Sequence, residues 1–235
     1  MCGRYSNAKK TIPKEHRYTD RYAGITPKPT YNAAPSQLLP VMPTQSNKVE
    51  FFNWGLLPTW AKDIKTAQPI NARAESLITN PLFRSLLSNK RCLVPADGFY
   101  EWQVQSMPQI DLFGNSVTSK GKPKKQPYRI ALKNDDLFSF AGLWDEWIDK
   151  NTGEVLKTFT IITTEANDLM RPIHDRMPVI LTPDAEELWL DEHETDKNLL
   201  LDLLRPYDAK EMKAYPISEL INSPANNSAE LLNSL

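Results

Sequence analysis

The sequence predicts an α+β fold in a single domain, built mainly from short strands with a few short peripheral helices. Of its 235 residues, 19 are proline and only 8 are glycine. Prolines spread along a chain interrupt long helices because proline lacks a backbone N–H. The composition, 40% hydrophobic and 24% charged, is that of an ordinary globular chain, and a chain of this length folds without disulfides or a structural metal. We therefore expect residues 1–235 to form one domain.

Six segments have the aromatic and β-branched composition of strands. In chain order they are residues 49–54, 91–95, 98–104, 128–133, 137–144 and 157–164. Asn151-Thr152-Gly153 predicts a turn. Residues 70–75 would place Asn71, Arg73 and Glu75 on one face if that segment is extended, because side chains alternate along a strand.

Helix signals are fewer. A capping residue followed by proline, a common start of a helix, occurs at Asn80-Pro81 and again at Thr182-Pro183. The first of these helices is predicted to run to about residue 90. A further short helix is expected to begin at Thr195 and to end before Pro206. A weaker helical pattern covers residues 13–22.

Two segments are predicted to lie outside the packed core. Residues 105–126 contain glycine, serine and a cluster of lysines, which favours a solvated surface loop over a DNA contact. Residues 222–235 are predicted to form an irregular C-terminal segment.

The composition also restricts the class of protein. The first twenty residues lack an apolar signal segment, and the longest apolar run, residues 138–144, is the length of a strand. We therefore expect a cytoplasmic protein with no membrane segment. Lys and Arg number 28 against 29 Asp and Glu, so the net charge of −1 would not attract nucleic acid from a distance.

Cys2 is the most informative residue. Initiator methionine is usually removed when the next side chain is small, and this would leave Cys2 with both a free α-amine and a thiol. Reference pKa values of about 7.7 to 8.0 for the amine and 8.5 for the thiol predict that part of each is nucleophilic at neutral pH without help. An aldehyde could then form an imine with the amine and a thiazolidine ring with the thiol. The alternative is a small residue in a frayed terminus.

Two further residues are candidates for proton transfer. Glu101 lies in the aromatic segment Gly98-Phe99-Tyr100-Glu101-Trp102, where desolvation would raise its pKa. The alternative is that strand alternation points Glu101 outward. His174 lies between Pro172 and Pro178, but a lone histidine is more often structural than catalytic.

Arginine and aromatic residues suggest contacts to a nucleic acid. Arg4, Arg73 and Arg176 are candidates for phosphate, because the guanidinium group matches phosphate oxygens. Trp60 is either part of the core or a stacking platform for a base. We expect no metal and no cofactor, because three dispersed histidines and two distant cysteines offer no ligand spacing and no Gly-rich phosphate loop is present.

Seven blocks of the sequence resemble the SOS response-associated peptidase family and occur in that family's order. They are MCGRY, YNAAP, WGLLPTW, NARAE, CLVPADGFYEW, AGLW and HDRMP, starting at residues 1, 31, 54, 71, 92, 141 and 174. The resemblance covers essentially the whole chain. It implies an α+β domain with curved sheets forming a barrel-like core.

The resemblance also implies a function: recognition of abasic sites in single-stranded DNA, and their shielding by a covalent thiazolidine link to the N-terminal cysteine. By similarity Cys2 is the nucleophile, Asn71 orients the reacting terminus, Glu101 moves protons and His174 assists opening of the sugar. Similarity assigns DNA contacts to four residues: Arg4, Trp60, Arg73 and Arg176. We expect a monomer, with associated self-processing peptidase and lyase activities as further possibilities.

Three other functions stay open at this point. Glutamine amidotransferases of the N-terminal-nucleophile class also begin with Met-Cys-Gly and use the cysteine to attack an amide, although 235 residues leave no room for a synthetase domain. A true peptidase would use Cys2, Glu101 and His174. The last alternative is a DNA-binding module without catalysis.

Overall fold

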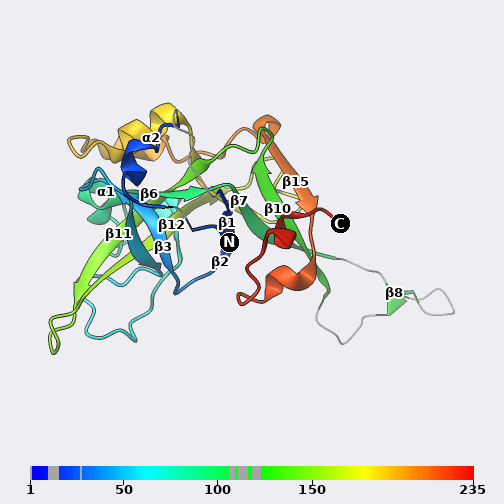
Figure 1. Ribbon diagram of the computed structural model, residues 1–235, viewed down its shortest axis with the longest axis horizontal. Coiled ribbons are helices and arrows are strands. Elements are labelled where there is room, and N and C mark those ends of the chain that lie inside the picture. The colour runs from blue at the N-terminus through cyan, green and yellow to red at the C-terminus, as the bar shows by residue number, and fades with distance from the viewer. Residues whose placement is uncertain (1, 10–15, 27, 106–108, 111–115, 118–122) are drawn as a thin grey trace.

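The computed structural model describes residues 2–9, 16–26, 28–105, 109–110, 116–117 and 123–235. Two large sheets and a few short helices make up the described chain, so the predicted α+β class is confirmed (Figure 1). No helix within these ranges is long and apolar enough to cross a membrane.

The core of the fold is a closed barrel of five strands: β3 (Leu38–Pro43), β4 (Glu50–Trp54), β6 (Arg91–Ala96), β11 (Phe138–Ile148) and β12 (Val155–Glu165). The strands pair in the order β12-β4-β3-β6-β11, and β11 then pairs back with β12, which closes the ring. Closure removes the free edges that an open sheet would expose. Three short strands extend the barrel sheet: β5 (Asn71–Arg73), β13 (Arg176–Pro178) and β14 (Ile180–Leu181).

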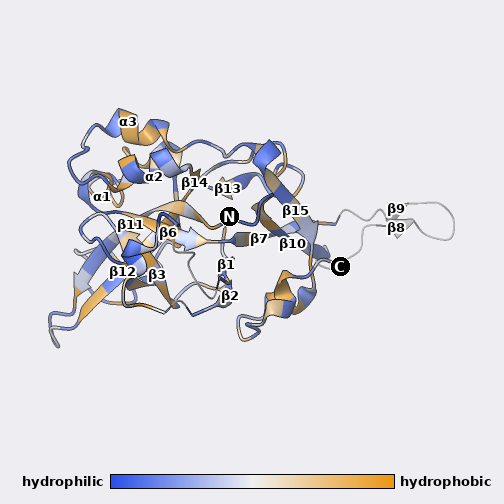
Figure 2. Ribbon diagram, turned by 45° about the horizontal axis from the view of Figure 1, so that its top comes forward, coloured by the Kyte–Doolittle hydropathy of each residue, from blue (hydrophilic) through white to orange (hydrophobic). Residues whose placement is uncertain are grey.

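The second sheet lies beside the barrel and carries the N-terminal strand. Its order is β15 (Met212–Pro216), β10 (Lys125–Leu132), β7 (Gly98–Val104), β1 (Tyr5–Asn7) and β2 (Thr30–Ala33). Figures 1 and 2 both place the start of the chain between the barrel strands and β7, β10 and β15. β8 (Gln109–Ile110) and β9 (Ser116–Val117) form a separate two-stranded pair.

Aromatic side chains join the two sheets. Tyr5 of β1 is fully buried, and its ring lies 5.3 Å from that of Trp54 and 5.8 Å from that of Phe140, both edge to face. Such pairs add to the stabilisation from burial alone. The first strand is therefore packed against the barrel core, and the residues that precede it are held near the junction of the sheets.

The predicted strands are present, and several are longer than expected. β11 and β12 continue to the pair Ile148 and Val155, beyond the buried core, because their backbones go on pairing up to the turn. Gly153 has φ +75° in that turn, as the Asn-Thr-Gly pattern predicted. β3 was not predicted from the sequence, because it contains two prolines and proline is unusual inside a strand. The ladder tolerates Pro40 and Pro43 opposite Phe51 and Cys92.

The helices are α1 (Leu86–Asn89), α2 (Pro183–Leu190) and α3 (Lys197–Asp202), and Figure 2 shows hydrophobic and hydrophilic residues on α2 and α3. The Thr182 cap of α2 is confirmed, since its hydroxyl accepts from the N–H of Ala185 at 3.4 Å. The prediction for residues 80–90 was too long, because the Asn80 side chain accepts from the N–H of Leu82 and a series of tight turns precedes α1. α3 starts two residues later than expected, with Asp196 as its cap.

Two other predictions need correction. Within residues 13–22 the described part contains turns and a 3-10 helix at Asp20–Tyr22 rather than an α-helix, and residues 13–15 lie outside the described residues. Residues 222–235 are packed rather than loose: they include the end of a 3-10 helix at Glu219–Asn222 and a second 3-10 helix at Ala229–Leu232, and Leu231 is 1% exposed. Much of the predicted loop at 105–126 lies outside the described residues.

Candidate functional site

The register between β1 and β7 places Cys2 and Glu101 on one antiparallel strand pair. Tyr5 lies opposite Phe99, and Ser6 lies opposite Gly98. The N–H of Tyr100 donates to the carbonyl of Arg4 at 3.0 Å, so the pairing continues toward the start of the chain. The residues before β1 therefore run alongside the part of β7 that carries Glu101.

Cys2 is fully buried, which changes the chemistry expected from its sequence position. Burial, and after it the negative charge of Glu101, raises the pKa of the Cys2 thiol well above its usual range. Its Sγ donates to the carbonyl of Arg4 at 3.7 Å. The sequence-based prediction of a partly ionised thiol was wrong, because it used the reference value for an exposed group. The thiol needs a base to become a nucleophile.

Glu101 is also buried, at 3% exposed, so the outward orientation considered above is excluded. Burial raises the pKa of Glu101, and positive charge, including that of His174, acts against this shift. The charge of Glu101 raises the pKa of Cys2, and the charge of His174 lowers that of Glu101, so Glu101 lies within electrostatic reach of both. A desolvated carboxyl group of this kind keeps its proton to a higher pH than an exposed one, which suits it to proton transfer.

His174 lies on the connection between β12 and β13, and hydrogen bonds fix this connection. Nδ1 of His174 accepts from the backbone N–H of Arg176 at 3.0 Å and lies 2.8 Å from the carboxylate of Asp175. The Gln103 side chain donates to the carbonyl of Pro172 at 2.9 Å, which ties the connection to β7.

Asn71 begins β5 and lies opposite Ile161 of β12. Its Nδ2 donates to the Ile161 carbonyl at 3.5 Å, whereas its Oδ1 is buried and accepts no hydrogen bond from the described residues. A buried acceptor without a donor is costly, so this oxygen is suited to bind a group that the free chain lacks. The predicted shared face with Glu75 is wrong, because the chain leaves β5 at Arg73 and Glu75 lies in a 3-10 helix.

The three predicted phosphate ligands differ in how far their guanidinium groups are already engaged. Arg176 makes a bidentate ion pair with Glu75 at 2.7 and 3.0 Å and donates to the carbonyl of Thr163. Arg4 donates to the side chain of Asn32 and to two backbone carbonyls of the C-terminal segment. Arg73 is exposed and makes no side-chain hydrogen bond or ion pair with the described residues. Of the three, Arg73 is the best placed to meet a phosphate.

Trp60 is 69% exposed, which excludes the core alternative. The loop that presents it is anchored on both sides. Thr59 donates to the carboxylate of Asp145 from its backbone at 2.8 Å and from its hydroxyl at 2.7 Å, and Trp147 donates to the carbonyl of Ala61 at 2.9 Å. An exposed indole on a fixed loop is a suitable surface for stacking.

Sequence reasoning missed Asn32, which organises the segment around Arg4. Besides accepting from Arg4, its Nδ2 donates to the carbonyls of Ser223 at 2.9 Å and Asn226 at 3.0 Å. Tyr100 supports the same region by donating to the carbonyl of Tyr31 at 2.7 Å. The available signal for Asn32 was its position in the block YNAAP.

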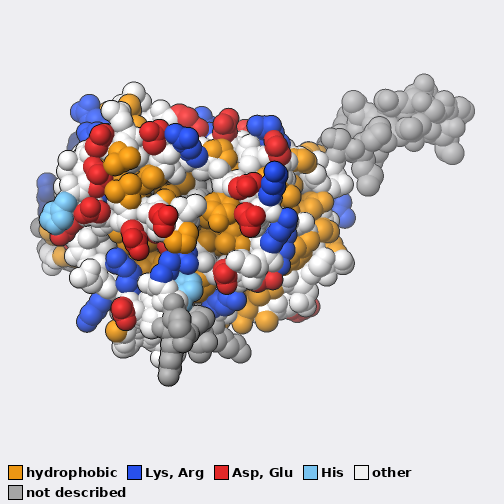
Figure 3. Space-filling model, turned by 90° about the horizontal axis from the view of Figure 1, so that it is seen from above, with side chains coloured by type: hydrophobic (Ala, Val, Ile, Leu, Met, Phe, Trp, Pro, Cys, Tyr) orange, Lys and Arg blue, Asp and Glu red, His pale blue; other side chains and the backbone are white. Residues whose placement is uncertain are grey.

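The charge distribution agrees with the near-zero net charge. On the face shown in Figure 3, Lys and Arg are interspersed with Asp and Glu around exposed hydrophobic side chains. Among the residues whose placement is described, no group of three or more His, Cys, Asp or Glu side chains could hold a metal ion.

The fold and site together define an α+β barrel protein in which the start of the chain is built into a buried site. The chain belongs to the SOS response-associated peptidase family, whose sequence model, described as "SOS response associated peptidase (SRAP)", matches residues 1–224. The family resemblance drawn from the motifs is therefore confirmed.

Relatives and solved structures match over most of the chain. It is 49% identical over 210 residues to the abasic site processing protein YoqW of Bacillus subtilis, covering 88% of this chain and 86% of that protein. It is 45% identical to YoaM of the same organism, covering 99% and 97%, and 30% identical to the abasic site processing protein HMCES of Xenopus tropicalis, covering 99% and 78%. A crystal structure of a protein from Bacteroides thetaiotaomicron is 31% identical, with a TM-score of 0.78 over 98% of this chain and 99% of that one.

Proposed function

We propose that this protein processes abasic sites in single-stranded DNA by forming a thiazolidine crosslink through Cys2 after removal of Met1. The printed names of its relatives support abasic sites as the substrate. One observation carries the chemistry: Cys2 and Glu101 are both buried on one strand pair, close enough for the charge of Glu101 to raise the pKa of the thiol. This arrangement supports a reaction in which Cys2 is the nucleophile and Glu101 the acid–base group.

In the proposed reaction the amine attacks first, because the thiol is held protonated. An abasic site in its ring-opened form carries an aldehyde, and the α-amine of Cys2 adds to it to give a carbinolamine. Protonated Glu101, whose pKa is raised by burial, donates its proton to the carbinolamine oxygen. The C–O bond breaks, water leaves, and a protonated imine forms.

Ring closure returns the proton to Glu101. The Glu101 carboxylate accepts the proton of the Cys2 thiol as sulfur attacks the imine carbon. The C–S bond forms while the electron pair of the C=N bond returns to nitrogen, which keeps its remaining proton. The net reaction joins aldehyde and aminothiol with loss of water and restores Glu101, so no other reactant is required.

Asn71 and His174 have supporting roles in this proposal. The buried Oδ1 of Asn71 accepts from the α-amine and directs its lone pair toward the aldehyde, a role that would satisfy its missing hydrogen bond. The imidazole of His174 donates a hydrogen bond to the sugar ring oxygen and thereby promotes ring opening. DNA is held by the exposed Arg73 and Trp60, with further contacts from the partly buried Arg4 and Arg176.

A denaturing gel tests the proposal. Protein without Met1 is incubated with an abasic single strand, with the same strand intact, and with glutamine. We expect a heat-stable shifted band only with the abasic strand, and no hydrolysis of glutamine. Cys2→Ala should lose the band, whereas the control Cys92→Ala, which alters the other buried cysteine in the barrel, should retain it. A heat-stable band that persists in Cys2→Ala, or release of glutamate by wild type, would contradict the proposal.

A further inference from the structure

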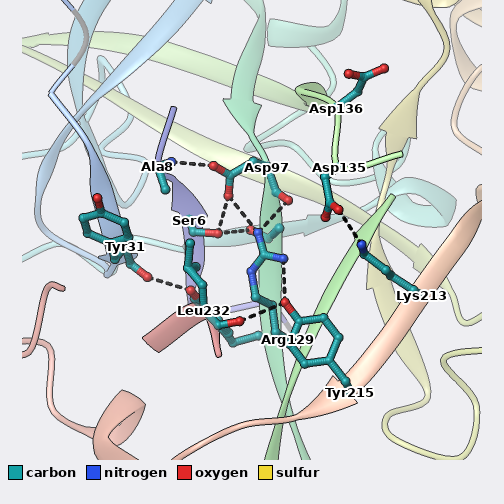
Figure 4. Close-up of polar contacts among 12 residues, drawn as sticks. Ser6, Ala8, Tyr31, Asp97, Arg129, Asp135, Asp136, Lys213, Tyr215 and Leu232 are labelled. Atoms are coloured by element: carbon teal, nitrogen blue, oxygen red, sulfur yellow. Dashed lines mark hydrogen bonds and ion pairs between the residues drawn. The ribbon is translucent and has the colours of Figure 1, made fainter. Parts of the chain in front are cut away.

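The carboxylate of Asp97 links β1 to the start of β7 (Figure 4). Asp97 is 5% exposed and lies between β6 and β7. Its Oδ1 accepts from the hydroxyl of Ser6 at 2.6 Å, and its Oδ2 accepts from the backbone N–H of Ala8 at 2.5 Å. Its own N–H donates to the carbonyl of Ser6 at 2.9 Å. One residue therefore holds the end of β1 through three hydrogen bonds.

Arg129 of β10 compensates the buried charge. Its Nη2 donates to Asp97 Oδ1 at 3.1 Å and to the Asp97 carbonyl at 3.0 Å, and its Nη1 donates to the hydroxyl of Tyr215 at 3.0 Å. A Cβ at Gly98 would lie 2.8 Å from the guanidinium carbon, so the absence of a side chain there lets Arg129 approach. Removing one member of such a buried pair leaves the other without a counter-charge.

β1 pairs with β7 over a short stretch, to which the burial of Tyr5 and the bond from the Tyr100 N–H to the Arg4 carbonyl add. It is three residues long, pairs with β7 at two positions, and shows a register irregularity against β2 between Tyr5 and Asn7. A slip of one residue turns every side chain of a strand to the opposite face. Cys2 lies three residues before β1 and Glu101 lies on β7, so a slip of β1 would separate these two groups.

We propose that Asp97 is a positioning residue for the crosslinking reaction: by fixing β1 on β7 it keeps Cys2 beside Glu101. This inference rests on the proposed function. Asp97 acts through the strand and not on the reacting atoms, because Ser6 lies four residues from Cys2, about 13 Å along an extended chain. It therefore affects the reaction rate more than DNA binding.

The test compares Asp97→Asn with Asp135→Asn, the same chemical change at an exposed residue whose ion pair with Lys213 lies nearby in Figure 4. Asp135 has φ +57°, a conformation that asparagine also adopts readily. Two quantities are measured: affinity for a strand with a non-reactive abasic analogue, and the crosslinking rate at saturating abasic DNA. We expect Asp97→Asn to slow crosslinking roughly 10- to 100-fold while affinity changes less than about 3-fold. Asp135→Asn should match wild type in both.

Ser6→Ala keeps the Asp97–Arg129 ion pair and provides a second test variant if Asp97→Asn does not fold. We expect it to slow crosslinking by a smaller factor, with a normal melting temperature. A folded variant with a wild-type rate, or equal losses of rate and affinity, would overturn the inference. Hydrogen exchange of the peptide containing residues 2–8 gives a readout that needs no DNA. If wild type forms no crosslink, the proposed function fails, whereas unchanged exchange in Asp97→Asn shows that Asp97 does not hold the strand.

Discussion

Burial acts in the same direction on the two acid groups of the site. It raises the pKa of the Cys2 thiol and that of Glu101, so both stay protonated to a higher pH than they would in water. For Glu101 this gives a proton to donate, and for Cys2 it requires a base before sulfur reacts. The proposed order, with the amine reacting first and the thiol second, is based on this difference.

Glu101→Gln should slow crosslinking by roughly 10²-fold or more, because the amide keeps the shape of the side chain but cannot transfer a proton. Binding to a strand with a non-reactive abasic analogue should change by less than about 3-fold, since the site keeps its shape. The exposed Glu154 provides the matched control, and Glu154→Gln should behave as wild type. Crosslinking rates at saturating DNA decide the matter, and parallel losses of rate and binding would mark Glu101 as structural.

The raised pKa of Glu101 also predicts how stability depends on pH. Between the ordinary glutamate pKa of about 4.3 and the higher folded value, the native state binds more protons than the unfolded state. The contribution of Glu101 to stability is therefore fully present below that ordinary value and is lost as pH rises through the folded pKa. Glu101→Gln removes this dependence, so the melting temperature of the variant minus that of wild type should increase as the pH is raised above about 4.3. A difference that stayed constant over this range would contradict the shift.

Arg73→Ala should weaken DNA binding and reduce the slope of log affinity against log salt by about 1, because one phosphate contact is lost. Chemistry at saturating DNA should remain near normal. Arg84, which is also exposed, gives the control Arg84→Ala, for which the slope should not change. Equilibrium binding over a series of salt concentrations measures both variants, and an unchanged slope for Arg73→Ala would remove this residue from the DNA contact.

At the scale of elements, the C-terminal segment supports the N-terminal strand. Ile217, Ile221 and Leu231 pack with Tyr100 of β7, and the carbonyls of Ile221 and Asn222 accept from Arg4. Residues near the C-terminus therefore help to position Arg4 near the N-terminus. The high polar content of this part of the chain concealed its supporting role in the sequence, because only Ile217, Ile221 and Leu231 join the buried cluster with Tyr100.

Leu231→Ala should lower the free energy of unfolding by about 2–3 kcal/mol, the usual cost of removing a buried leucine side chain. Leu235 is 75% exposed, so Leu235→Ala should change it by less than about 0.5 kcal/mol. Urea denaturation measures both values. Equal, small effects would show that the segment is not part of the packed structure.

Strands were easier to predict than helices for a physical reason. The barrel strands bury long runs of apolar and β-branched residues, such as those of β6 and β12, which the composition reveals directly. α1 has no strong periodic pattern, and Asn80 makes a local turn that competes with helix formation. β1, β2 and β15 depend on pairing with distant strands, which local composition does not encode.

At the scale of the whole molecule, the site is assembled from the N-terminus, β5, β7 and the β12–β13 connection. Sequence motifs identified residues on all four, but only the fold shows that Glu101 lies within electrostatic reach of Cys2 and His174. Burial of Cys2 and the engagement of Arg4 by the C-terminal segment could not be predicted, because both depend on contacts between distant parts of the chain. The mixed surface charge means that DNA must be held locally.

The intact mass of the protein after incubation with an abasic oligonucleotide shows whether the crosslink requires a free Cys2 amine. Two preparations are compared, one without Met1 and one that retains it. In the second, a peptide bond turns the amine of Cys2 into an amide nitrogen, which cannot form an imine. We predict a heat-stable adduct on the processed protein, with a mass equal to the sum of protein and oligonucleotide less one water, and none on the protein that retains Met1. A heat-stable adduct on the Met1-bearing protein would contradict the requirement for a free Cys2 amine.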